Sequence, residues 1–445
     1  NVTLAGNTTV GAGSNLLILG NDATFANTLD LGANTLTVAT PNAATVVPVF
    51  QPNPAFILDA ANVEIASKIT GTGGLTKTVA GTLSLLAGSS GGNTFTGDLT
   101  ITGGKVVVAS TPGQPAVNSS EIYIGNAAST GGGVNATLQA GQLSASAGAN
   151  MIGTYNALTN ASTTNLTIYA DGKYAMNNGT NGFANLTLKG GLIDGGTVGT
   201  HTALTVTGGI TAVASPQTAV LQNGNLLMSA SNFTFNVATG GTGGVGLRID
   251  DLVQNGVGYT AGSAGTSFVK SGTGTLVLSG ANGANTYQGI TNVSQGILNI
   301  QSATALGQVG SFLGDTGNGT VVATNAQLQL DKSTGLTFGI ESLTLNGTGF
   351  STDGALRNVS GNNTWQGYVY LGSDSRINAD SGTTLTIANP TDINADILNG
   401  LTSGQNLTVG GVGNTTVNGG IAGTINNVVK DETGTLELAG SHGSA

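Results

Sequence analysis

The sequence predicts an all-β fold, a parallel β-helix in which short strands stack coil upon coil into a solenoid with protruding loops. Three observations predict it: phrases that recur along the chain, short strands broken by Gly or Asn, and an unusual composition. The chain has 445 residues with 74 Gly, and only 7% are charged. Repetition indicates stacked units of similar structure, and we expect residues 1–445 to form a single continuous segment.

The first recurring phrase joins a lysine to two leucines that are separated by one residue. It runs from Lys77 to Leu85, from Lys270 to Leu278 and from Lys430 to Leu438. Since side chains alternate across a strand, both leucines of a pair should point to the same side. We expect the leucines to point into the core and the lysines to be exposed turn residues that discourage unwanted strand pairing. The six leucines are Leu83, Leu85, Leu276, Leu278, Leu436 and Leu438.

The second phrase reads Asn-Thr-aromatic-x-Gly, and its aromatic residues are Phe95, Tyr287 and Trp365. Two interpretations are open: a track on which carbohydrate rings stack, or equivalent corners at which the rings pack on the core. The Asn, Thr and Gly recur together with the aromatic residue, which favours the structural interpretation.

Between the phrases, apolar residues alternate with Thr, Ser and Asn, as in 29–38, 99–108 and 341–347. This alternation predicts half-buried strands, and Gly and Asn at the breaks suit turns. No long segment shows a helical period, so we expect almost no helix.

Three segments break the pattern, of which two are expected to protrude or turn and the third to leave the regular coils. Two are rich in proline, Pro41–Pro54 and Thr111–Ser120, and proline cannot donate to an inner ladder. The third, Gly240–Gly265, is weakly patterned and is expected to be a lateral excursion.

Composition excludes several classes of protein. The net charge is −10 without a basic patch, which argues against nucleic-acid binding. No run of about 18 apolar residues is present, so no transmembrane segment is expected. The chain has no Cys, and a long solenoid buries enough core to do without disulfides. Both ends read as mid-pattern coils, so the chain is expected either to continue in a longer polypeptide or to stack on another copy.

Taken together, the phrases resemble a known repeat. Gly73-Gly74-Leu75 precedes Lys77 and completes one copy, and Asp353–Trp365 is typical of the same proteins. The sequence resembles the autotransporter-associated β-strand repeat, also called the passenger-associated transport repeat. Val79 departs from the glycine that this repeat usually has there, and Asp431-Glu432 departs at the same place in the third phrase.

The resemblance implies a right-handed parallel β-helical passenger of a large bacterial protein, extracellular or on the bacterial outer surface. Such passengers commonly serve as adhesins or stalks. The implied partners are a second copy or a flanking module stacked end to end, and surface polysaccharide or other cells.

β-Helices also include polysaccharide lyases and hydrolases, which need convergent carboxylates and a base. The best cluster is Arg248-Ile-Asp250-Asp251, and Asp374-Ser-Arg376 is a second. Each is either a sugar or Ca²⁺ site or a solvated turn with a local ion pair, and we favour the turn.

Other candidates for chemistry are weaker. The two histidines, His201 and His442, lie far apart in the sequence, which argues against a zinc site and a catalytic triad. Gly190–Gly196 resembles a Ca²⁺-binding nonapeptide but has no tandem copy, so we expect a turn there.

The sequence therefore favours a non-catalytic extracellular rod, a stalk, adhesin or filament subunit, with no cofactor or metal. The alternative from a different class is a polysaccharide-active β-helix enzyme.

Overall fold

The structure is a computed structural model, and it describes residues 1–11, 17–20, 27–40, 63–87, 92–110, 115–140, 163–177, 180–196, 203–256, 265–308, 319–390, 396–399, 404–422 and 424–440. These residues form short strands and two 3-10 turns, and none of them lies in an α-helix. Their contacts divide the chain into two compact units. Unit 1 comprises Asn1–Ser229 with Gly256–Gly258, and unit 2 comprises Ala230–Asn255 with Tyr259–Ala445. The single continuous segment stays a prediction.

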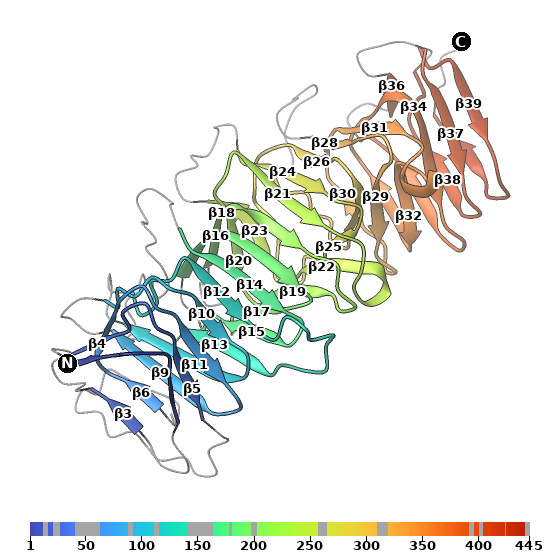
Figure 1. The fold of residues 1–445 in the computed structure, drawn as a ribbon. Helices are drawn as coiled ribbons and strands as arrows, with labels where there is room; N and C mark the ends of the chain where they lie inside the picture. The colour runs from blue at the N-terminus through green and yellow to red at the C-terminus, as the bar shows by residue number, and fades with distance from the viewer. Residues whose placement is uncertain are drawn as a thin grey trace. The chain divides into compact units, whose positions relative to one another are not determined.

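Unit 1 contains three parallel ladders, in which a strand pairs with its counterparts one coil earlier and one coil later (Figure 1). The first ladder consists of β2 (Thr8–Val10), β5 (Leu36–Ala39), β8 (Leu75–Thr78), β10 (Leu99–Ile101), β12 (Glu121–Ile124), β14 (Asn165–Tyr169), β16 (Thr180–Lys189) and β18 (Ala203–Ala212). The second consists of β3 (Leu17–Leu19), β6 (Val63–Ile65), β9 (Thr82–Ala87), β11 (Gly104–Ser110), β13 (Ala136–Ala140), β15 (Gly172–Ala175), β17 (Leu192–Asp194) and β19 (Ala219–Gln222). The third consists of β1 (Val2–Thr3), β4 (Thr28–Asp30) and β7 (Lys68–Thr70), and β20 (Asn225–Met228) pairs with β18.

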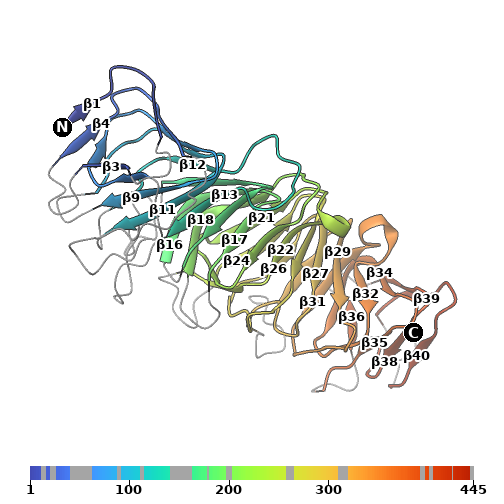
Figure 2. The same cartoon turned by 90° about the horizontal axis from the view of Figure 1, so that it is seen from below.

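Unit 2 also contains three parallel ladders. The first consists of β21 (Asn232–Val237), β24 (Ser267–Ser271), β26 (Thr291–Val293), β28 (Thr320–Val322), β31 (Leu343–Gly347), the first part of β34 (Val369–Ala379) and β36 (Ile397–Asn399). The second consists of β22 (Val245–Ile249), β25 (Thr275–Leu278), β27 (Gly296–Ile300), β29 (Ala326–Asp331), β32 (Leu356–Ser360), the second part of β34, β37 (Asn406–Gly410) and β39 (Asn427–Lys430). The third consists of β30 (Thr337–Phe338), β33 (Asn362–Trp365), β35 (Thr384–Ile387), β38 (Asn414–Val417) and β40 (Leu436–Leu438), and Figure 2 shows β35, β38 and β40 side by side. The remaining elements are β23 (Leu252–Asn255) and the 3-10 turns η1 (Thr242–Gly244) and η2 (Phe350–Thr352).

This architecture is a parallel β-helix, as the sequence predicts. In-register pairing places apolar residues of successive coils on top of one another, for example Leu75 on Leu99 and Leu99 on Ile122. All three side chains have 0% exposure. The core of each unit is therefore a set of apolar columns, while alternate residues face outward.

The predicted strands within 29–38, 99–108 and 341–347 are confirmed as β4 with β5, β10 with β11, and β31. One predicted excursion is wrong where the structure describes it. Within Gly240–Gly265, β22 pairs in parallel with β25, with a register shift between Val245 and Leu247, and so belongs to the stacked coils. Within Thr111–Ser120, which is predicted to protrude or turn, the described Ala116 and Val117 are fully buried and so do not protrude.

Other predictions fall outside the described residues. These are the loop Pro41–Pro54, the histidines His201 and His442, and Thr111–Gln114 of the second proline-rich segment. Within the described ranges, no helix has both the length and the apolar character needed to cross a membrane.

Candidate functional site

In the first two copies of the lysine phrase, backbone carbonyls surround the lysine ammonium group at the corner between two strands. We call this arrangement a cage. Lys77 ends the inward row of β8, and its Nζ donates to the carbonyls of Thr78 (2.7 Å), Val79 (2.6 Å) and Gly103 (3.3 Å). The first two carbonyls belong to the same corner, and the third belongs to the next coil. An ammonium group has three N–H donors, so one lysine cross-links two coils.

The second phrase repeats this geometry residue for residue. Lys270 Nζ donates to the carbonyls of Ser271 (2.8 Å), Gly272 (2.7 Å) and Gln295 (2.9 Å), the last again from the following coil. Burial lowers the pKa of Lys77 to about 8 and that of Lys270 to about 7.

The prediction that these lysines are exposed is therefore wrong. Lys77 and Lys270 both have 0% exposure. The register explains this, because Lys77 pairs with Val38 on one side and Ile101 on the other, both inward residues. The lysine stem lies in an apolar column while its charged head turns to the backbone carbonyls of the corner.

The third copy of the lysine phrase forms the same corner, but its lysine has one hydrogen-bond partner fewer. Lys430 Nζ donates to the carbonyls of Asp431 and Glu432, the second at 3.3 Å. No carbonyl from a following coil reaches it within the described ranges. Lys430 is half-buried, unlike its two counterparts.

The leucines also differ between the first two copies of the lysine phrase and the third. Leu83, Leu85, Leu276 and Leu278 point inward and are at most 1% exposed. In the third phrase Leu436 is half-buried and Leu438 is 41% exposed. Leu438 nevertheless pairs with Val417, an inward residue with 0% exposure. Its register is thus inward, and its exposure arises because no described strand stacks on the outer edge of β40.

The second residue after each motif lysine has a left-handed backbone. The φ angles are 54° at Val79, 73° at Gly272 and 58° at Glu432. This conformation points two carbonyls of the corner at the ammonium group. It favours glycine and is unfavourable for a β-branched residue, so Val79 and Glu432 are strained substitutes.

The asparagine of the second phrase ties each coil to both neighbours. Asn93 Oδ1 accepts from the Ile69 amide at 2.8 Å, and its Nδ2 donates to the Ala116 carbonyl at 2.7 Å. Asn285 bonds in the same way to the Val253 amide and the Ala305 carbonyl. In the third copy of the Asn-Thr-aromatic phrase, Asn363 instead donates hydrogen bonds within its own coil, to Asn358 and Ser360.

The aromatic residues of the three phrases are core residues. Phe95, Tyr287 and Trp365 have 0% exposure, so the alternative of a carbohydrate-stacking track is wrong for them. Tyr287 stacks on Phe268 with ring centroids 5.5 Å apart, and Trp365 packs on Phe338 at 5.4 Å.

The glycine that ends this phrase permits close contact between coils. A Cβ atom at Gly289 would lie 2.2 Å from the carbonyl oxygen of Thr266, and one at Gly367 would lie 1.6 Å from that of Glu341. Gly97 is equally close to Gly73. Any larger residue would push two coils apart.

A buried acid lies in the same region of unit 2. Glu341 is 7% exposed, and its carboxyl accepts a hydrogen bond of 2.5 Å from the Thr320 hydroxyl. Burial raises the pKa of Glu341 to about 8. This group is therefore mostly protonated at neutral pH.

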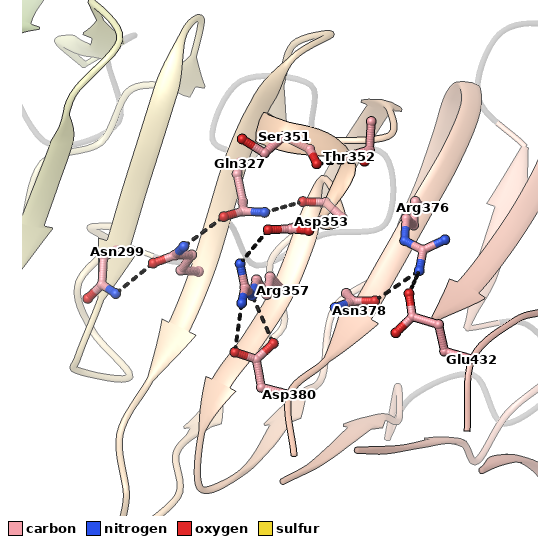
Figure 3. Close-up of polar contacts among 12 residues, drawn as sticks. Asn299, Gln327, Ser351, Thr352, Asp353, Arg357, Arg376, Asn378, Asp380 and Glu432 are labelled. Carbon is pink, nitrogen blue, oxygen red and sulfur yellow. Dashed lines mark hydrogen bonds and ion pairs between the residues drawn. The ribbon is translucent and has the colours of Figure 1, made fainter. Parts of the chain in front are cut away.

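A row of polar side chains runs across the second ladder of unit 2 (Figure 3). Asn299 donates to Gln329 at 2.9 Å, Gln329 to Gln327 at 2.7 Å, and Gln327 to the Gly354 carbonyl at 2.8 Å. These bonds link β27, β29 and the turn that follows η2.

Arg357 continues this row. Its guanidinium binds both carboxylate oxygens of Asp380, at 2.8 and 2.9 Å, and reaches Asp353 at 2.9 Å. This cluster was not predicted from the sequence. The spacing of 23 residues between Arg357 and Asp380, about one coil, could have indicated it.

Arg376, at the end of this region, binds the corner that contains Lys430. Arg376 Nη1 lies 2.5 Å from Asp431 Oδ2, and Nη2 lies 2.6 Å from Glu432 Oε1. The guanidinium passes over Gly410 of β37, where a Cβ atom would lie 1.9 Å from Nη2. The side chain thus spans from β34 across β37 to the corner after β39.

The two clusters considered for catalysis are engaged in structural contacts. Arg248 Nε lies 2.8 Å from Asp250 Oδ1, which also accepts a hydrogen bond from Ser279. Asp374 accepts from the backbone and side chain of Asn406, and not from Arg376. The expected ion pair within Asp374-Ser-Arg376 is wrong.

The remaining candidate is also accounted for within the fold. Gly190–Gly196, predicted to be a turn, contains the strand β17, and Asp194 bonds to Lys173, Asn223 and the Gly196 amide. Among the described residues no group of three or more His, Asp or Glu could hold a metal ion.

The fold and its corners define a class, that of β-solenoid repeat proteins whose repeats are joined by buried polar side chains. The family model of the passenger-associated-transport-repeat matches residues 75–108 and 268–300. Each matched range contains a motif lysine and the third carbonyl of its cage, Gly103 or Gln295. These two ranges carry the repeat of autotransporter passengers, which is not a known enzyme family. No curated protein matches the chain.

Proposed function

We propose that the chain is a structural or adhesive segment of an extracellular passenger, which acts by its stacked coils and not by chemistry. The observation that carries this proposal is the cage of Lys77 and Lys270. In both copies the residue that typifies the repeat bonds to backbone carbonyls of two coils. A residue used in this way joins coils and is not available to a substrate.

The absence of catalysis is a part of this proposal. It is supported by the partners of the charged side chains in unit 2, where Arg357 holds Asp380 and Arg376 holds Asp431 and Glu432. A general acid or base must reach a substrate, whereas these groups bond between coils. The alternative of a polysaccharide lyase or hydrolase has no particular observation in its favour.

End-to-end stacking of coils is the proposed mode of assembly. Parallel ladders extend by adding a strand to an open edge. Such contact depends on backbone hydrogen bonds and apolar columns, so it should be almost insensitive to salt.

The test combines location with activity. The protein is produced in a bacterium that carries an autotransporter system, and its surface exposure is measured by protease accessibility and antibody labelling of intact cells. We expect surface labelling, increased adhesion of cells to glycan arrays or host cells, and no polysaccharide turnover. Polysaccharide cleavage that is lost in Asp250→Asn with Asp251→Asn would contradict the proposal, as would retention inside intact cells.

A further inference from the structure

Four successive coils of unit 1 present a grid of outward side chains on the first ladder, on β10, β12, β14 and β16. Register pairing stacks one column of this grid, whose members are Thr100, Tyr123, Thr167 and Thr187. The neighbouring column follows two residues later on each strand, and there Tyr169 pairs with Lys189. Buried residues such as Ile124 and Ile168 alternate with both columns. The two columns therefore share one outer surface of the sheet.

The tyrosines of this grid differ from the buried aromatic residues of the repeat phrases. Among the described residues of unit 1, Tyr123 and Tyr169 are the two aromatic residues that are not buried. Neither hydroxyl has a hydrogen bond within the described ranges. The two residues are one coil and two strand positions apart, which places their Cα atoms about 8 Å from one another. Both rings can thus contact one extended ligand.

Gly125 leaves open space beside both rings. It follows Tyr123 by two residues and lies one coil before Tyr169, where an added Cβ atom would be 3.0 Å from the Tyr169 Cβ atom. Its φ of 100° is left-handed and favours glycine. Tyr123, Gly125, Thr167 and Tyr169 thus form a square of outward positions in which one corner has no side chain.

One edge of the surface carries carboxylates and an amide. Glu121 and Asn165 lie two residues before the central column, and Asn165 Nδ2 donates to Glu121 Oε1 at 2.7 Å. Asp98 occupies the same position one coil earlier. Burial raises the pKa of Tyr123, and the charges of Glu121 and Asp98, followed by Tyr169, raise it further. Both acids therefore lie near the Tyr123 hydroxyl.

The opposite edge is bordered by the loop that follows β12. Lys189 Nζ donates to the Ala127 carbonyl at 3.3 Å, and the Asn126 amide donates to Asp171 Oδ1 at 2.8 Å. These contacts hold the start of the loop against the coils that carry Tyr169 and Lys189. The two tyrosine rings thus lie between an edge of carboxylates and an edge of ordered backbone.

We infer that this surface of unit 1, centred on Tyr123 and Tyr169, is a binding site for a neutral hexose polysaccharide. A pyranose ring has C–H groups on its faces, which pack on tyrosine rings, and hydroxyls around its edge. The carboxylates and the amide bond to such hydroxyls. Asp98, Glu121 and the net charge of −10 disfavour polyanions. This inference rests on the adhesive role proposed above and names its ligand class and contact residues.

The experiment measures binding of the full chain to soluble polysaccharides by biolayer interferometry. The neutral probes are a glucan, a mannan and a galactan, and the anionic probes are alginate and heparin. We expect binding to a neutral probe and not to the anionic ones, weakened about tenfold by Tyr123→Ala and by Tyr169→Ala. The matched control is Tyr370→Ala, which removes a half-buried tyrosine from the first ladder of unit 2 and should leave binding unchanged.

A conservative variant separates loss of the ring from loss of the fold. Tyr123→Phe keeps the stacking face and should retain binding within about threefold, and circular dichroism verifies that each variant remains folded. Binding that both alanine variants leave intact overturns the site but not the adhesive role. Preference for alginate or heparin overturns the ligand class. A chain that binds none of the probes overturns the inference, whereas surface labelling and adhesion of whole cells decide the proposed function separately.

Discussion

The corners at Lys270 and Lys430 lie in the same unit and share the same backbone turn, yet they differ by one hydrogen bond. At Lys270 the ammonium has three carbonyls and the side chain is fully buried. At Lys430 it has two, and an arginine clamp holds the turn instead. A coil of this protein is thus completed by the coil after it, through a backbone carbonyl that any sequence can supply.

The largest expected effect is the loss of a complete cage. Lys270→Met keeps the stem in its apolar column and leaves three carbonyls without their donor, so the free energy of unfolding should fall by about 3 kcal/mol. Lys77→Met should behave alike. The measurement is urea denaturation at pH 6, below the lowered pKa of about 7. Lys332→Met is the control and should change the stability by less than about 0.5 kcal/mol. An equal change in the free energy of unfolding in all three variants would mean that the cages make no contribution of their own to stability.

The second effect is a pH dependence that arises from Glu341 of unit 2. Burial raises the pKa of Glu341 from 4.5 to about 8. Between these values the folded chain binds the proton and the unfolded chain does not, so the contribution of Glu341 to stability falls as pH rises. Glu341→Gln cannot ionise. We expect the stability of wild type relative to this variant to decrease by on the order of 3 kcal/mol between pH 4 and pH 7. A constant difference would show that Glu341 is ionised in the fold.

A smaller effect concerns the left-handed residue of the two complete corners. Val79→Gly should stabilise unit 1 by about 1 kcal/mol, because glycine adopts the φ of 54° without strain. Gly272→Val should destabilise unit 2 by more than this, since a Cβ atom there would also lie 2.4 Å from the Val237 carbonyl oxygen. Thermal unfolding of both variants measures the two changes in stability. Changes of equal size and opposite sign would argue against a clash with the Val237 carbonyl oxygen.

The smallest effect is expected at the incomplete corner. Lys430→Met in the monomeric chain should cost less than about 1 kcal/mol, because the ammonium is half-buried and water can replace it at two carbonyls. Hydrogen exchange of the amides around Asp431 and Glu432 detects local loosening. A loss as large as that of Lys270→Met would show that the third carbonyl is irrelevant to the cage.

Much of the fold could be predicted from the sequence, because the alternation of side chains in a strand is a strong constraint. The leucine pairs Leu83 with Leu85 and Leu276 with Leu278 point inward for this reason. The same alternation also indicates where the lysines lie. Lys77 follows Leu75 by two residues, and both side chains therefore face the core. The expectation of an exposed lysine came from its charge, and the register was the better guide.

The contacts between coils could not be predicted in the same way. The third carbonyl of each cage comes from Gly103 or Gln295, and a backbone oxygen has no signature in the sequence. The clamp from Arg376 to Glu432 spans two coils, and the separation of such a pair depends on the length of every turn between them. The strand β22 within Gly240–Gly265 could not be predicted because glycine-rich flanks obscure a run of five residues.

The buried asparagines have a consequence for the order in which structure forms. The Asn93 amide accepts a bond from the coil before it and donates one to the coil after it. In a newly formed last coil, the Nδ2 group of this asparagine and one N–H donor of the lysine therefore have no partner. They acquire one when the next coil forms. Folding should then resemble the growth of a crystal from a seed, slow for the first pair of coils and rapid as each layer is added to a surface already prepared for it.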